Sequence, residues 1–198
     1  MLFPNDFIEE KIKVNGIEIN CKYGGNKEYK IPLLLIHGYP QTHIMWHKIV
    51  TELSKKYFIL CPDLRGYGDS SKPKGDSEHI LYSKKTMAKD MIELMDYFGF
   101  DKFYVAGHDR GARVTHRMCL DYASRVLKAC VMDITPTYHM FKNTDQSFAT
   151  GYYHWFFLIQ GDNLPETLIG SNARYFLEEK LKRWSSKDAI FKEVFQEN

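Results

Sequence analysis

The sequence predicts an α/β fold built around a mostly parallel, doubly wound sheet. Nearly continuous apolar runs lie at 31–36, 57–61 and 103–106, and stretches with helical spacing separate them. Uninterrupted apolar runs are typical of parallel strands that are buried on both faces. Their alternation with helical stretches therefore indicates helices that cover a single sheet.

The N-terminal part predicts an antiparallel hairpin. Segments 12–14 and 17–19 alternate apolar and polar residues on either side of Asn15-Gly16. This dipeptide is the one most favoured in two-residue hairpin turns, because both turn positions need a positive φ.

Two helices are predicted from apolar residues spaced three and four apart. Their apolar faces consist of Trp46, Ile49, Val50 and Leu53 in the first helix, and Met87, Met91, Leu94, Met95 and Phe98 in the second. A third helix is predicted over 112–122, and the run 126–132 predicts one more strand, which ends at Asp133.

The chain changes in character after Pro136. An aromatic-rich stretch at 152–157 and a helical segment at 172–184 follow, with no further apolar run typical of a strand. We therefore expect a core over 1–135 and a partial helical cap, or lid, over 136–198.

The composition argues against several classes of protein. The 198 residues are 44% hydrophobic, and the net charge of +2 gives no reason to expect nucleic acid or a membrane as partner. Apolar runs stay well short of the roughly 20 residues of a membrane-spanning helix, and the four cysteines are scattered, so we expect a cytoplasmic protein with reduced thiols. No metal or organic cofactor is expected, because neither ligand spacing nor a phosphate-binding glycine loop is present.

The most informative motif is Gly107-His108-Asp109-Arg110-Gly111, between a predicted strand and a predicted helix. Glycines on both sides permit a tight turn that pushes the central side chain out at the end of the sheet. The helix N-terminus there favours an ionised carboxylate, so Asp109 is a candidate nucleophile. A carboxylate in this place attacks saturated carbon and forms an alkyl ester with it. The alternative is an aspartate that only caps the helix.

Arg110 and Arg113 lie three residues apart at the start of the same helix, so both can reach one side of a pocket. Arginine binds carboxylates in a bidentate fork, which suits an anionic substrate. The alternative is that both form surface ion pairs.

Three ordered motifs give a resemblance to a known family. His37–His43, Asp63–Ser70 and Gly107–Ala112 each follow a predicted strand. Together they resemble the oxyanion loop, the glycine-rich loop and the carboxylate elbow of the α/β-hydrolase superfamily, and within it the haloacetate dehalogenase group. The epoxide hydrolases of that superfamily usually carry tryptophan after the nucleophile, where this sequence has Arg110.

The resemblance implies an α/β-hydrolase fold and a role for several residues. Asp109 would displace halide from a short 2-haloacid, and Arg110 and Arg113 would bind the substrate carboxylate. The backbone N–H groups of Tyr39 and Arg110 would form an oxyanion hole. Asp133 would be the acid that orients a catalytic histidine; the alternative is a turn cap.

The resemblance also implies that His154 and Trp155 hold the leaving halide through N–H donors. Packing in an aromatic helix is the alternative for this pair. Water would be the only co-substrate.

The superfamily needs a histidine after its last core strand to activate water, and none of the eight histidines here can fill that place. The chain resembles the N-terminal two-thirds of such an enzyme, with the C-terminal strands missing. We therefore expect an unpaired sheet edge at 126–132 and little or no turnover. A complementary C-terminal chain or a homo-oligomer would cover that edge.

Two other functions stay open. An epoxide hydrolase of the same fold would use lid tyrosines such as Tyr152 or Tyr153 to protonate the opening oxygen. The second is a non-catalytic remnant or one half of a split protein.

Overall fold

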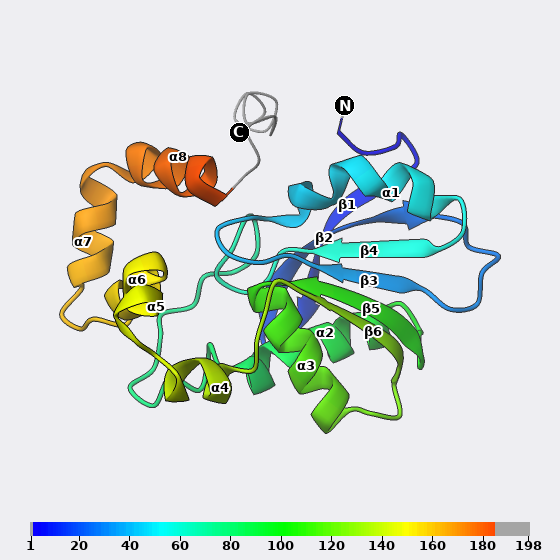
Figure 1. The fold of residues 1–198 in the computed structure, drawn as a ribbon. Coiled ribbons are helices and arrows are strands. Elements are labelled where there is room, and N and C mark those ends of the chain that lie inside the picture. Colours follow the sequence, from blue (N-terminus) through cyan, green and yellow to red (C-terminus); the bar gives the residue numbers. More distant parts are fainter. Residues whose placement is uncertain (1, 185–198) are drawn as a thin grey trace. The chain divides into compact units, whose positions relative to one another are not determined.

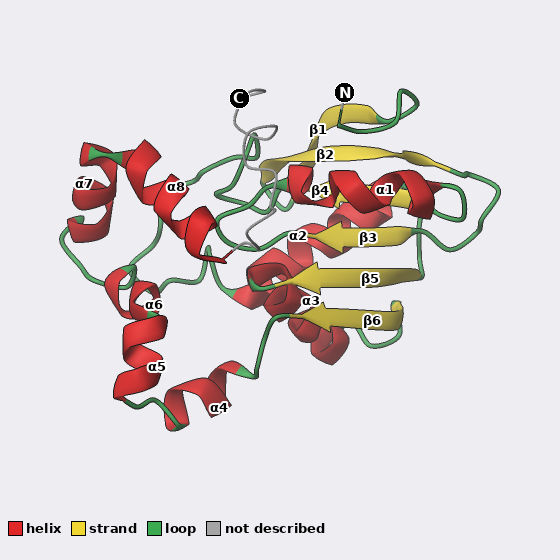
Figure 2. Cartoon of the chain, turned by 45° about the horizontal axis from the view of Figure 1, so that its top comes forward, coloured by secondary structure: helices red, strands yellow, loops and turns green. Residues whose placement is uncertain are grey.

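The fold is known from a computed structural model that describes residues 2–184. The chain divides between Ile134 and Thr135 into two compact units. The first unit contains a six-stranded sheet with helices on both faces, and the second contains helices only within the described residues (Figures 1 and 2). Residues 185–198 of the predicted cap lie outside the described residues.

The sheet has the strand order β1-β2-β4-β3-β5-β6. Its strands are β1 (Ile8–Val14), β2 (Ile17–Gly25), β3 (Leu33–Ile36), β4 (Phe58–Pro62), β5 (Phe103–His108) and β6 (Val126–Met132). The first two strands are antiparallel, β2 pairs antiparallel with β4, and the remaining pairs are parallel. The predicted hairpin is confirmed, with Asn15 and Gly16 at φ values of 45° and 77°.

Helices cover the two faces of this sheet. A 3₁₀ turn η1 (His43–Trp46) and α1 (His47–Ser54) lie on one face, and α2 (Lys84–Tyr97) and α3 (Arg110–Asp121) lie on the other (Figure 2). Alternate strand residues serve the two faces: Leu34 and Leu60 pack towards Met91, whereas Leu35 and Ile59 pack towards Trp46. The predicted parallel, doubly wound arrangement is therefore confirmed.

One predicted core position is wrong. Ile49 was expected on the buried face of the first helix, yet it is 44% exposed, while Val50 is fully buried. The sequence spacing assumed one regular helix from Trp46 onward. A 3₁₀ turn ends at Trp46, yet Trp46, Val50 and Leu53 still pack in one cluster with the spacing of a single helical face. Ile49 lies at the edge of that face, where it reaches solvent.

The second unit is described by itself. It consists of α4 (Thr137–Lys142), α5 (Gln146–Gly151), α6 (Tyr153–Phe157), α7 (Leu164–Ser171) and α8 (Ala173–Trp184). Aromatic rings hold α4, α5 and α6 together: Phe141 lies 5.5 Å from Trp155, and Phe148 stacks on Tyr152 at 4.9 Å. The role of this unit as a lid stays a prediction.

The last strand, β6, is an open edge among the described residues. It pairs with β5 alone, and its side chains are largely exposed, including Leu127 at 43% and Val131 at 50%. Unpaired N–H and C=O groups beside apolar side chains form a surface that pairs with other strands.

We expect the isolated 198-residue chain to self-associate through β6, and Val131→Lys to reduce that association, because a lysine on an edge strand opposes strand pairing. Light scattering after size-exclusion chromatography measures the effect. Leu120→Lys is the matched control, since Leu120 is 63% exposed and lies on the helix α3 and not on a strand. An equal effect of both substitutions would show that general surface hydrophobicity, and not the strand edge, drives association.

Candidate active site

The candidate nucleophile Asp109 stands in a strained turn between β5 and α3. Its φ is 46° and its ψ is −111°, a conformation that non-glycine residues rarely adopt. Its backbone N–H donates to the carbonyl oxygen of Met132, 3.1 Å away, which ties the turn to the end of β6. The side chain is therefore held at the carboxyl end of the parallel strands.

The flanking glycines allow the backbone to approach closely. A Cβ on Gly111 would overlap the carbonyl oxygens of Ile36 and His37, and a Cβ on Gly107 would meet the backbone of Gly111 and the Thr115 hydroxyl. The sequence predicted that these glycines make the turn possible. The positive φ belongs to Asp109 itself, and the glycines let the start of α3 pack directly on the end of β3.

The loop after β3 supplies a hydrogen bond to the carboxylate. The backbone N–H of Tyr39 donates to Asp109 Oδ1 at 2.8 Å, across 70 positions of sequence. The Arg110 guanidinium lies 5.7 Å from the centre of the Tyr39 ring, which is a cation–π contact. The Tyr39 N–H thus contacts the carboxylate, and the oxyanion-hole role of the Tyr39 and Arg110 backbones stays a prediction.

His37 supports this loop and uses both ring nitrogens to do so. Its Nε2 accepts from the backbone N–H of Leu64 at 2.9 Å, so Nδ1 carries the proton and donates to the Gly38 carbonyl at 2.9 Å. Burial lowers the pKa of the imidazole from 6.5 to about 4, although Gly38 and Asp63 partly oppose the shift. The neutral ring is a fixed structural link with no nitrogen left for proton transfer.

Asp63 is the centre of a buried hydrogen-bond cluster. Its Oδ1 accepts from the backbone N–H and Nδ1 of His43, at 2.8 and 3.0 Å, and its Oδ2 accepts from Asn20 and from the backbone N–H of Asp69. Burial alone would raise the pKa of this carboxyl, but the hydrogen bonds and charge of His43 outweigh burial and lower it to about 2. The cluster joins the loops after β3 and β4 to the hairpin.

Three positively charged side chains lie near Asp109. Arg110 and Arg113 occupy the first turn of α3, as predicted, and Lys84 begins α2. Burial, followed by the charges of Arg110 and Arg113, lowers the pKa of Lys84 to about 8, while Asp109 acts in the opposite direction. Lys84 is therefore a third cation near the elbow that sequence reasoning did not single out.

Asp133 follows β6, beside the elbow. It has a φ of 57°, and its Oδ2 lies 3.6 Å from Nε2 of His108, the residue before the nucleophile. Its side chain is 73% exposed. The predicted role of Asp133 as the acid of a triad stays a prediction; the contact with His108 was not foreseen.

The residues predicted to bind halide lie in α6 of the second unit. His154 is buried and its ring lies 4.8 Å from that of Trp184, while Trp155 packs against Phe141 and Phe148. These contacts are consistent with the packing alternative, and the halide role stays a prediction.

The tyrosines considered as proton donors also lie in this unit. Tyr152 stacks on Phe148, and the ammonium of Lys180 lies 3.7 Å from the ring centre of Tyr153.

Residues 2–184 were searched for metal-binding clusters and for membrane-spanning helices. No group of three or more His, Cys, Asp or Glu side chains in this range is placed to hold a metal ion. Across the same residues, every helix is too short or too polar to cross a membrane.

The sequence contained a signal for the residues that were missed. Asp63 follows the buried strand β4, as Asp133 follows the exposed strand β6, and His43 begins η1, four residues after Tyr39. A strand-end carboxylate next to a glycine-rich loop is a candidate for binding that loop. The partner of the carboxylate could not be chosen, because eight histidines were available.

Comparison with known proteins places these motifs in a family context. A family model of the α/β-hydrolase fold matches residues 31–167. A fluoroacetate dehalogenase from Burkholderia sp is 44% identical over 183 residues, 92% of this chain. A soluble epoxide hydrolase from Corynebacterium sp. (strain C12) is 37% identical over 123 residues, 62% of this chain.

A solved structure has the same fold. A protein from Nostoc sp PCC 7120 described only as an α/β-hydrolase superposes with a TM-score of 0.93 at 49% identity, over 100% of this chain and 66% of that one. The chain spans 59% of the length of the dehalogenase and 40% of that of the epoxide hydrolase.

We expect the free energy of unfolding to fall as the pH drops from 6.5 to 4. Unfolded His37 takes up a proton near pH 6.5 and folded His37 only near pH 4, so acid favours the unfolded chain in this window. The difference between the two pKa values of His37 corresponds to a loss of roughly 3 kcal/mol in the free energy of unfolding. The contribution of Asp63 is lost only at lower pH, between about 4 and 2. Denaturant titrations at each pH measure this loss.

His37→Gln should remove the slope between pH 6.5 and 4, whereas His116→Gln, a change at an exposed histidine of α3, should leave it intact. NMR titration of the His37 ring in the unaltered chain provides a readout that does not depend on the variant folding. A midpoint near pH 6.5 would contradict the burial argument.

Proposed function

Because the chain belongs to the α/β-hydrolase family, we propose that it carries the nucleophile of a dehalogenase of short 2-haloacids. The observation that carries the proposal is the strained Asp109, which has one oxygen bound to the Tyr39 N–H and two arginines in the helical turn that follows it. The 44% identity to the Burkholderia fluoroacetate dehalogenase supports the haloacid as substrate class.

In the first step the substrate alkylates Asp109. Oδ1 is held by Tyr39, which leaves Oδ2 to attack the carbon that bears the halogen. An oxygen–carbon bond forms, the carbon–halogen bond breaks, and the halide leaves with its electron pair. The product is an ester between Asp109 and the 2-carbon of the acid.

The substrate carboxylate meets the cations beside the elbow. Arg110 and Arg113 can bind the substrate carboxylate in a bidentate manner, which orients the halogen away from Oδ2 for in-line displacement. His154 and Trp155 would donate N–H groups to the departing halide. Lys84 adds positive charge that favours an anionic substrate.

In the second step water attacks the carbonyl carbon of the ester and gives up a proton to a base, and the negative charge that develops on Oδ1 is stabilised by the Tyr39 N–H. The bond between that carbon and Oδ2 then breaks, and the 2-hydroxy acid leaves after its oxygen takes up a proton. This step needs a general base, which Asp133 would orient. His37 cannot serve, because both nitrogens are bonded and its pKa is about 4. No histidine follows His154 in the 198 residues.

We expect chloroacetate to form a stable ester on Asp109 of the 198-residue chain. Intact mass and peptide mapping locate the adduct. Free cysteines, of which Cys130 is exposed, react with the same reagent. Hydroxylamine separates the two products because it cleaves an ester and leaves a thioether intact. Asp109→Asn should give only the thioether.

Arg113→Ala should slow ester formation by roughly 10- to 100-fold, the usual worth of a charge-assisted hydrogen bond. Arg117→Ala is the matched control, because Arg117 lies one turn further along α3 and pairs with Asp121 at 2.7 Å. Equal rates for the two variants would remove the carboxylate clamp from the proposal.

We expect one halide per chain and no sustained turnover, because hydrolysis lacks its base within these residues. A halide electrode measures the stoichiometry over time. Continued release in many-fold excess over the protein would contradict the assignment of the second step.

Two alternatives make different predictions in the same assay. An epoxide hydrolase would give an ester from a simple epoxide and none from chloroacetate; the Corynebacterium relative is the reason to include it. A non-catalytic half of a split protein would give neither and would bind a complementary chain along β6, whose open edge supports this possibility.

A further inference from the structure

A pocket lies at the end of the parallel strands opposite to Asp109. Asp109 follows the carboxyl end of β5, whereas this pocket is bounded by Phe58 at the start of β4 and by Phe98 and Phe100, which precede β5. The six residues of β5 span about 20 Å, so the two places are separate. The pocket volume is about 440 Å³, within the range of sites for small organic ligands.

Aromatic rings form the floor of this pocket. Phe98 and Phe100 stack with ring centres 6.5 Å apart, and Phe58 lies 5.6 Å from Phe100. Phe98 and Phe100 are only half-buried, and Ile8 beside them is 53% exposed. The pocket therefore offers apolar surface to a flat or chain-like molecule.

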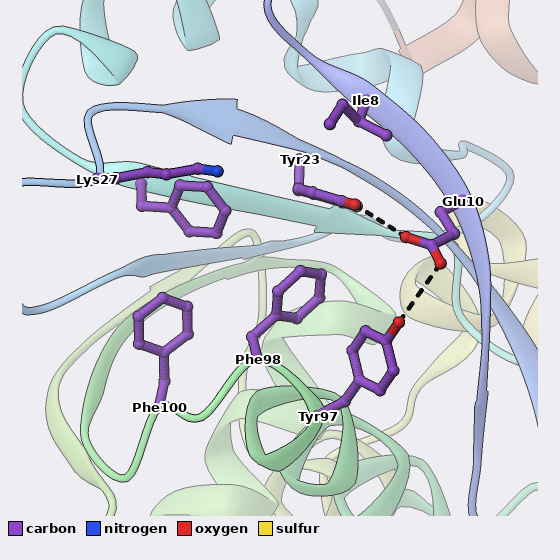
Figure 3. Close-up of a pocket in the computed structure, with 8 residues that line it drawn as sticks. Ile8, Glu10, Tyr23, Lys27, Tyr97, Phe98 and Phe100 are labelled. Carbon is purple, nitrogen blue, oxygen red and sulfur yellow. Dashed lines mark hydrogen bonds between the residues drawn. The ribbon is translucent and has the colours of Figure 1, made fainter.

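Charged groups stand at opposite sides of the rings, with Lys27 on one side and Glu10 on the other (Figure 3). Both oxygens of Glu10 are already bonded, because Tyr23 donates to Oε2 at 2.8 Å and Tyr97 to Oε1 at 3.4 Å. Burial, and then the hydrogen bond to Glu10, raise the pKa of Tyr23 to about 12, so the phenol remains a donor. The acidic side of the pocket is thus satisfied by the chain's own residues.

Lys27 is different. Its ammonium lies 5.9 Å from the centre of the Phe58 ring, and among residues 2–184 no carboxylate lies within 4.0 Å of it. An exposed cation at the rim of an aromatic floor can pair with an anion whose apolar part lies on the rings. The ammonium of Lys27 is therefore the charged group of the pocket that can pair with a ligand.

We propose that this pocket binds an organic monocarboxylate with an apolar body of phenylalkyl size. Its carboxylate pairs with Lys27, and its body lies on Phe98 and Phe100. The site does not depend on the chemistry at Asp109.

The probe is 4-phenylbutyrate, with its uncharged amide for comparison, in NMR titrations of the 198-residue chain. We expect saturable shifts of the backbone amides of Ile8, Tyr97 and Phe100, with a Kd on the order of 1 mM. The amide should bind roughly three- to fivefold more weakly. Absence of saturable shifts at these amides would overturn the proposal.

Three variants separate the parts of the proposal. Lys27→Gln should weaken the carboxylate roughly three- to fivefold and leave the amide unchanged, whereas Lys30→Gln, the matched control outside the pocket, should change neither. Ile8→Ser should weaken both ligands alike. Equal effects of Lys27→Gln and Lys30→Gln would overturn the ion pair.

Arg113→Ala tests the position of the ligand, because the arginines beside Asp109 can also bind a carboxylate. The shifts at Ile8 and Phe100 should be the same in this variant as in the unaltered chain. Their loss in Arg113→Ala would assign the binding to the elbow and overturn the second site.

Discussion

The buried carboxylate of Asp63 is the interaction on which the geometry of the candidate site depends. Its two oxygens bind His43 from the loop after β3, Asn20 from β2, and the backbone of Asp69 from the glycine-rich loop. An unpaired charge in this place would be costly, so the three segments are held together by the need to satisfy it. Tyr39 lies in the first of these segments, and its N–H reaches Asp109 only because that loop is fixed.

The candidate nucleophile Asp109 is held from three directions. Met132 anchors its backbone, Tyr39 binds its side chain, and Gly111 lets the helix behind it touch the end of β3. A positive φ at an aspartate is unfavourable and persists only where the surroundings impose it. The strain at Asp109 is thus maintained by packing, which keeps the carboxylate oriented before any substrate arrives.

The two ends of the parallel strands differ in chemistry. The carboxyl end gathers cations and a backbone donor around the carboxylate of Asp109, whereas the amino end gathers aromatic rings beside Lys27. Helix α2 spans this distance, since Lys84 begins it and Tyr97 ends it. The open edge at β6 is the third distinct surface of the first unit, and it is the place where additional strands would extend the sheet.

The sequence alone determined the features that are encoded within a few neighbouring residues. These are the hairpin turn at Asn15-Gly16, the order of strands and helices, the elbow around Asp109, and the family to which the motifs point. Local patterns suffice there, because turn conformation and burial on one face depend on adjacent residues. Only the tertiary structure decided which distant groups meet: Tyr39 with Asp109, His43 with Asp63, His108 with Asp133, and Lys27 with Phe58. It also turned Ile49 outward. Such pairings depend on the directions of side chains in space after the sheet has formed, and sequence spacing carries no record of those directions.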